Sequence, residues 1–148
     1  MLPKAWKPLY DSLAAMLKAR TDVPLDTLKE AWPKTVREGN LGNFLADALR
    51  KEAGADIALW PASSLRAGLP KGKVSVGDLW KAMPPPEQAS VFELPGSDVQ
   101  RLLLRQMTQP RDFLFLSGAQ CTPDSSRFGG SPIQVFVDGK PIQSSGRY

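Results

Sequence analysis

Apolar residues recur at spacings of three and four along several stretches of the chain, which predicts four helices. The first begins near Trp6 or Pro8 and ends at about Ala19. The second starts around Asn40, an expected N-cap, and ends at Gly54. A short helix follows the weak capping box Ser75 to Asp78, and a longer one follows Ser97. The apolar faces are Leu9, Leu13, Met16 and Leu17; Leu41, Phe44, Leu45, Ala48 and Leu49; Leu79, Trp80 and Met83; Val99, Leu102, Leu103 and Met107.

Between these helices, short apolar or alternating runs predict extended segments and strands. The strongest hairpin signal is Asp138-Gly139, which leaves room for a short return strand over 141–143. Interspersed helices and strands favour an α+β domain, a mixed sheet packed with three or four helices. The expected extended segments are 22–26, 56–60, 89–94, 113–116 and 133–137.

The amino-acid composition excludes several classes of function and says less about the fold. With 148 residues, 42% of them hydrophobic and 23% charged, the chain has room for one globular domain. The absence of histidine excludes Ser-His-Asp and Cys-His nucleophile pairs and zinc sites that use histidine. The net charge of +4 is spread along the chain, so we expect no nucleic-acid partner. Cys121 is the only cysteine and has no partner for an internal disulfide. No apolar run suggests a membrane span, and the first residues do not resemble a secretion signal.

One short segment carries candidate chemistry. Arg37-Glu38-Gly39-Asn40-Leu41-Gly42-Asn43 lies where a helix should begin, and helix N-termini and arginine both favour anions. Either the segment binds a phosphate, or its glycines only shape the turn and Arg37 is a solvated charge. Arg66 comes after a predicted strand, and ligands bind at the ends of strands in α/β sheets. Alternatively, Arg66 is an exposed charge in a loop. The acidic residues form no clustered metal-ligand set, so we expect no catalytic and no metal-binding residue.

Five ordered blocks give the chain a resemblance to a known family. They resemble the C-terminal domain of the 5′-nucleotidase and UDP-sugar hydrolase family over about Asp22 to Tyr148. The resemblance implies that residues 1–21 form a linker helix and residues 22–148 a substrate-recognition domain. It also implies a separate N-terminal metallophosphoesterase domain with two divalent metals, and a periplasmic or extracellular location. The blocks are REGNLGNFLADALR (37–50), GADIALWPASSLR (54–66), GKVSVGDLWKAM (72–83), ELPG (93–96) and VDGKPI (137–142).

The resemblance also implies roles for individual residues. Arg37 and Arg66 match arginines that hold the substrate's phosphates or nearby groups, and Asn40 and Asn43 join them in the implied substrate-binding set. Two departures affect nucleobase recognition. Pro61 stands where an asparagine would hydrogen-bond the base, and Pro85 replaces the aromatic residue that stacks on it. An altered substrate class is therefore as plausible as a site that has lost its function.

Two hypotheses of different classes follow. The first is a substrate-recognition domain of a metal-dependent phosphoester hydrolase, inactive in isolation and without a cofactor of its own. The second is a structural or interaction domain with the same fold, in which the first helix and Trp6 bind a partner. Trp60 and Trp80 are expected in the core, and Cys121, Ser63 and Ser64 are expected as loop polar groups without a base to activate them.

The end of the chain raises an expectation about its sheet. The resemblance implies a further strand beyond Tyr148, to which the hairpin at Asp138-Gly139 would return the chain. Without that strand, a neighbouring strand keeps an unpaired edge that is open to association with another chain.

Overall fold

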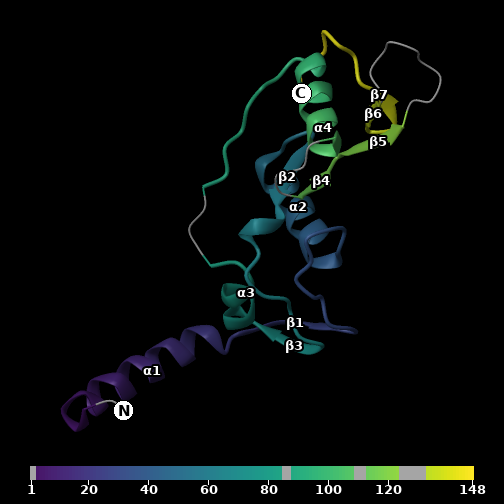
Figure 1. Ribbon diagram of the computed structural model, residues 1–148. Helices are drawn as coiled ribbons and strands as arrows, with labels where there is room; N and C mark the ends of the chain where they lie inside the picture. Colours follow the sequence, from purple (N-terminus) through teal and green to yellow (C-terminus); the bar gives the residue numbers. More distant parts are fainter. Residues whose placement is uncertain (1–2, 85–87, 109–112, 124–132) are drawn as a thin grey trace. The chain divides into compact units, whose positions relative to one another are not determined.

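The computed structural model describes residues 3–84, 88–108, 113–123 and 133–148, and the chain alternates between two compact units (Figure 1). The first unit contains Met1–Lys34 and Arg66–Pro85, and the second contains Thr35–Leu65 and Pro86–Tyr148. Four α-helices and three small antiparallel sheets lie in the described residues, so the predicted α+β class is confirmed. None of the helices in these ranges has the length and apolar character needed to cross a membrane.

The first unit pairs two short strands and adds a helix to each. Helix α1 (Lys7–Thr21) leads into β1 (Pro24–Leu28), which pairs antiparallel with β3 (Gly72–Ser75). Helix α3 (Val76–Ala82) follows β3 directly. Trp32 and Leu69 extend the pairing through two backbone hydrogen bonds of 3.0 and 2.8 Å. The buried apolar residues of this unit are Leu69, Val74 and Ala82.

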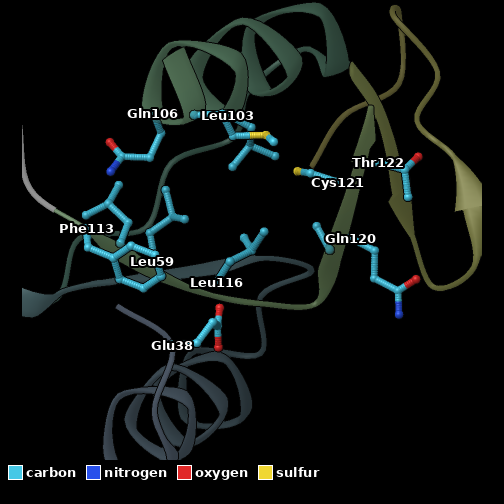
Figure 2. Close-up of a pocket in the computed structure, with 12 residues that line it drawn as sticks. Glu38, Leu59, Leu103, Gln106, Phe113, Leu116, Gln120, Cys121 and Thr122 are labelled. Carbon is cyan, nitrogen blue, oxygen red and sulfur yellow. The ribbon is translucent and has the colours of Figure 1, made fainter. Parts of the chain in front are cut away.

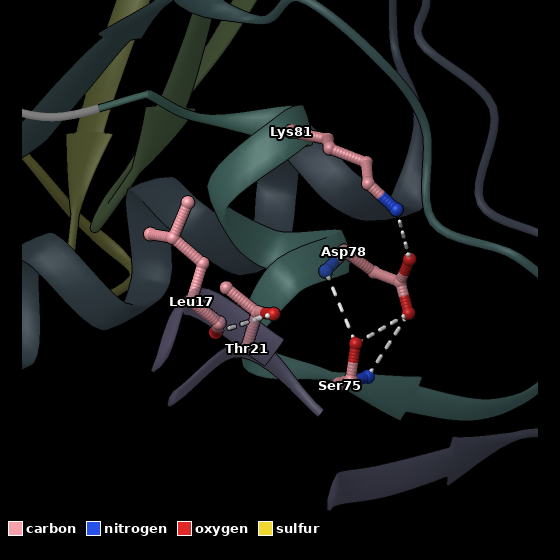
Figure 3. A network of polar contacts seen from close by, with 5 residues as sticks. All are labelled: Leu17, Thr21, Ser75, Asp78 and Lys81. Carbon is pink, nitrogen blue, oxygen red and sulfur yellow. Dashed lines mark hydrogen bonds and ion pairs between the residues drawn. The ribbon is translucent and has the colours of Figure 1, made fainter. Parts of the chain in front are cut away.

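The predicted capping box of α3 is confirmed (Figure 3). The Ser75 hydroxyl accepts from the N–H of Asp78 at 3.3 Å, and the Asp78 carboxylate accepts from the N–H of Ser75 at 3.1 Å. The same carboxylate accepts from the Ser75 hydroxyl at 2.9 Å and pairs with Lys81 at 3.3 Å. These bonds lower the pKa of the Asp78 carboxyl, with the Ser75 hydroxyl as the largest cause. A local spacing of three residues was therefore enough to locate this helix start.

In the second unit, a helix covers a two-stranded ribbon. Helix α2 (Asn40–Ala53) packs on β2 (Ala58–Pro61) and β4 (Leu114–Ser117), which pair antiparallel with Leu59 opposite Leu116. Gly54 ends α2 in the left-handed conformation at φ 61°, as its position predicted. A 3₁₀ turn, Ala62–Ser64, follows β2 inside the segment expected to be a loop.

The rest of the second unit is a helix and a three-stranded meander. Helix α4 (Gly96–Thr108) contacts β6 (Ile133–Val137), which lies between β5 (Ala119–Pro123) and β7 (Lys140–Pro141). The predicted hairpin is confirmed, because Asp138 and Gly139 both have positive φ, of 49° and 72°. Its return strand is β7, slightly earlier than predicted. Val99, Leu103, Ile133 and Val135 form the core of this part.

Three expectations about these elements were wrong. Residues 89–94 form no strand; Leu94 alone pairs with Tyr148, and Val91 and Phe92 are 69% and 73% exposed. β-Branched and aromatic residues favour a strand only where a neighbouring strand can pair with them. Trp80 is exposed instead of buried, because the short helix α3 turns it away from its packed face, whereas Trp60 is half-buried. Cys121 lies in β5 and not in a loop.

Candidate functional site

The segment before α2 is held in a tight turn by its own side chains. The Thr35 hydroxyl donates to the carbonyl of Arg37 at 2.6 Å. A Cβ at Gly39 would lie only 2.6 Å from the Thr35 Oγ1 atom, so this close approach requires glycine. The carbonyl of Gly39 accepts the first helical hydrogen bond, from the N–H of Asn43 at 3.0 Å. Thr35 and Gly39 together fix where α2 begins.

Gly39 is therefore the N-cap of α2, and the prediction that Asn40 caps the helix was wrong by one residue. Asn40 is already the first helical residue, and its side chain is exposed. As a glycine, the N-cap residue Gly39 has no side chain that could accept a hydrogen bond from the first N–H groups of α2. The side-chain amide of Asn43 instead donates to Glu38 Oε2 at 2.8 Å, which ties the first turn of the helix back to the preceding segment.

The two predicted arginines belong to different units. Arg37 precedes α2 in the second unit, and Arg66 follows the 3₁₀ turn in the first unit. Both side chains are exposed, and neither forms an ion pair with another described residue. The backbone of Arg66 is fixed, because its N–H donates to the carbonyl of Ala82 at 2.8 Å. An exposed guanidinium beside an uncapped helix N-terminus is suited to binding an oxyanion.

Contacts with β4 position α2, and sequence reasoning did not find them. A Cβ on Gly42 would lie within 3 Å of three ring atoms of Phe115, a side chain with no exposed surface. The buried Ser117 hydroxyl donates to Asp47 Oδ1 at 2.5 Å and accepts from Arg50 Nε at 2.9 Å. These partners are about 70 residues apart in the chain, so no local pattern identifies them.

A pocket of about 630 Å³ lies in the second unit, and Glu38, which accepts a hydrogen bond from Asn43, is one of its lining residues (Figure 2). In the figure, Leu59 and Leu116 point toward Leu103 on α4, and the Cys121 sulfur points into the same space. Burial raises the pKa of the Cys121 thiol, so this group stays protonated at neutral pH. The other lining residues are Glu38, Gln106, Met107, Phe113, Leu114, Ala119, Gln120 and Thr122.

Two further expectations concern base recognition and metals. Pro61 is the half-buried last residue of β2 and has no polar side-chain atom, while Pro85 lies outside the described residues. Ser63 and Ser64 belong to the 3₁₀ turn after β2. In the ranges that the structure describes, no three His, Cys, Asp or Glu side chains are grouped as metal ligands.

The four helices and the small antiparallel sheets define an α+β domain, with the segment from Arg37 to Asn43 at the start of α2. Residues 18–148 match the model of the 5′-nucleotidase C-terminal domain, and the chain belongs to that family. The family predicted from the five sequence blocks is thereby confirmed.

Individual relatives agree with this assignment. The trifunctional nucleotide phosphoesterase YfkN of Bacillus subtilis is 36% identical over 87 residues, which cover 56% of this chain and 6% of YfkN. A 5′-nucleotidase precursor from Thermus thermophilus is 27% identical with a TM-score of 0.72, over 96% of this chain and 31% of its own. The sulfate thiohydrolase SoxB of Thermus thermophilus, at 19% identity and a TM-score of 0.68, shares the fold over 93% of this chain and 30% of its own. The chain thus spans less than a third of each relative.

Proposed function

We propose that this chain recognises the phosphate-bearing substrate of a 5′-nucleotidase-like, metal-dependent phosphoester hydrolase and does not catalyse hydrolysis by itself. One observation carries the proposal: in a chain of this family, Arg37 and Arg66 are exposed at the positions matched to substrate-binding arginines. We assign the chemistry and two divalent metals to a separate N-terminal metallophosphoesterase domain. The word "precursor" in the name of the Thermus thermophilus relative supports a periplasmic or extracellular location.

The segment before α2 supplies several groups suited to phosphate. The Arg37 guanidinium offers paired N–H donors that match two phosphate oxygens. The N-cap residue Gly39 makes no side-chain hydrogen bond to the N-terminus of α2, and the helix dipole there favours negative charge. The amide of Asn43 uses one of its two hydrogens on Glu38, which leaves the second for a ligand. Asn40 is exposed beside them in the first turn.

A titration with inorganic phosphate, followed through backbone amide resonances, tests this proposal. We expect binding in about the millimolar range or weaker, because a site completed by another domain is only partly present here. Arg37→Ala and Arg66→Ala should each weaken binding. Lys51→Ala is the matched control, since Lys51 is an exposed cation in the last turn of α2. Equal loss of binding in all three variants would indicate general charge attraction and refute the assigned site.

Adding a nucleobase to the ligand tests the substrate class. We expect adenosine monophosphate to bind no more tightly than inorganic phosphate, because Pro61 offers the base no side-chain hydrogen bond. In the same experiments, p-nitrophenyl phosphate with Mg²⁺ or Mn²⁺ should not be hydrolysed. Turnover that survives repeated purification and disappears when one of the chain's own carboxylates is replaced would contradict the non-catalytic role.

One observation favours the second candidate function, an interaction domain. The apolar stripe of α1 is exposed, with Leu13 49% and Leu17 59% accessible to solvent, and Trp6, the residue before α1, is 60% accessible. A helix that buries no residue within its own unit is suited to contact with another surface. If phosphate shifts no resonance near Arg37 or Arg66, this candidate is preferred.

A further inference from the structure

A carboxylate lies beside the proposed anion-binding groups at the start of α2. Glu38 follows Arg37 directly, and its Oε2 atom accepts from the side-chain amide of Asn43 at 2.8 Å. Between Thr35 and Asn43, Arg37 and Glu38 are the only charged residues, so their charges cancel. The N-terminus of the helix adds roughly half a positive charge. This part of the chain is therefore close to neutral and only weakly favours an anion.

The hydrogen bond to Asn43 also sets how far this carboxylate lies from a ligand. The planar side-chain amide has two hydrogens about 120° apart on Nδ2, and Glu38, which is exposed, takes one of them. A ligand oxygen bonded to the second hydrogen lies about 3 Å from Nδ2. The carboxylate oxygen and the ligand oxygen are then about 5 Å apart, within the roughly 10 Å over which salt screens charges. At this distance in water, each negative charge on the ligand lowers its affinity about three- to fivefold.

We propose that Glu38 is a specificity-determining residue that disfavours doubly charged phosphomonoesters and thereby selects singly charged phosphodiesters. This role rests on the proposed function, in which the phosphate of the substrate binds at Arg37 and Asn43. A second negative charge on the phosphate gains little from a nearly neutral segment and is repelled by the Glu38 carboxylate. A phosphodiester carries a single charge and is repelled only once.

Glu38 also positions the amide that the ligand contacts. The backbone of Asn43 is fixed in the first turn of α2, because its N–H donates to the carbonyl of Gly39 at 3.0 Å. The side-chain amide can still rotate about its last bond, and the hydrogen bond to Glu38 holds one orientation. Removal of the charge and removal of the hydrogen bond therefore have opposite effects on binding. The first relieves repulsion, and the second releases the amide.

Two substitutions of Glu38 separate its charge from its hydrogen bond. Glu38→Gln removes the charge and keeps a carbonyl oxygen that accepts from Asn43, whereas Glu38→Ala removes both. Glu52→Gln is the matched control, because Glu52 is an exposed carboxylate near the other end of α2. At a helical rise of about 1.5 Å per residue, the two carboxylates are about 20 Å apart, beyond the range of unscreened charge.

Titrations with methyl phosphate and dimethyl phosphate, followed through backbone amide resonances, measure the discrimination. At about pH 8 the monoester carries close to two negative charges and the diester carries one. The quantity compared is the dissociation constant of the diester divided by that of the monoester. We expect Glu38→Gln to raise this ratio about three- to fivefold over the wild-type chain, and Glu52→Gln to leave it unchanged. Glu38→Ala should bind both ligands more weakly than Glu38→Gln.

The possible results separate this role from the proposed function. An unchanged ratio in Glu38→Gln would overturn the role of Glu38 even if both ligands bind. An equal rise in Glu52→Gln would overturn it too, because the effect then comes from the total charge of the chain. If Glu38→Ala and Glu38→Gln bind equally well, the positioning role is wrong. When neither ligand shifts a resonance near Arg37 in any of these chains, the proposed function itself fails.

Discussion

Replacing Gly42 with alanine tests whether the close contact between α2 and β4 sets the stability of the second unit. On an exposed helical site, Gly to Ala stabilises by about 1 kcal/mol, because glycine loses more backbone entropy on folding. Gly42 is buried, and the added Cβ would fall within 3 Å of three ring atoms of Phe115, where ordinary contact begins at 3.4 Å. The ring is fully buried and is held edge to face against Phe113, with centroids 5.2 Å apart.

Overpacking of a filled core costs up to about 3 kcal/mol, and the gain in helix propensity offsets about 1 kcal/mol of it. We therefore expect Gly42→Ala to lower the free energy of unfolding by about 2 kcal/mol. For a chain of this size, that corresponds to a Tm lower by about 4 to 8 °C. Urea denaturation followed by circular dichroism gives the free energy, and a thermal melt gives the Tm.

Two further variants separate overpacking from helix propensity. Ala48→Gly changes an exposed position of the same helix and should cost about 1 kcal/mol, which measures propensity alone. Phe115→Leu makes room for the new methyl group, so the double variant should be more stable than the sum of the single effects by about 1 kcal/mol. The reasoning fails if Gly42→Ala is as stable as the wild-type chain, or if the two substitutions are additive.

Two other predictions concern titratable groups. Ser75→Ala should lower the free energy of unfolding by about 1 kcal/mol at pH 7, because it removes the cap of α3. The control Ser12→Ala, at an exposed position of α1, should leave it unchanged, and chemical denaturation measures both variants. The pKa of the Asp78 carboxyl is lowered in the folded chain, so the stabilisation by Ser75 is present above the ordinary pKa of 3.8 and is lost as the pH falls through the pKa of the folded chain. If the stability difference between Ser75→Ala and the wild-type chain is the same at pH 2 as at pH 7, this explanation is wrong. Burial raises the pKa of Cys121, so at pH 8 iodoacetamide should modify the folded chain at least about 10-fold more slowly than the urea-unfolded chain, and equal rates would refute this. The same shift means that stability falls as the pH rises above 9.0, where the unfolded thiol ionises.

The elements that sequence predicted well depend on local interactions. The periodicity of α2 and α4, the Ser75 to Asp78 capping box and the Asp138-Gly139 turn all involve residues within a few positions of one another. Such signals do not require knowledge of the fold, because helix caps and tight turns form from adjacent residues.

The elements that sequence missed depend on distant partners. Strand β5 pairs residue by residue with β6 across an intervening segment, and no alternating pattern marks it. The apolar stripe of α1 predicted its helix, but it gave no information on what the stripe contacts, and Leu13 and Leu17 are exposed. Periodicity specifies which residues share a helix face, whereas burial depends on the surface opposite that face.

The candidate site shows how one short motif can combine two roles. In the segment from Arg37 to Asn43, Gly39 accommodates Thr35 and Gly42 accommodates Phe115, so both glycines serve packing. Arg37 makes no ion pair within the described residues, so packing does not explain its presence. A substitution at Gly42 should therefore lower both stability and phosphate binding, whereas Arg37→Ala should lower binding with the melting temperature unchanged. Binding and stability measured on the same two variants thus divide the motif into its structural and its ligand-binding residues.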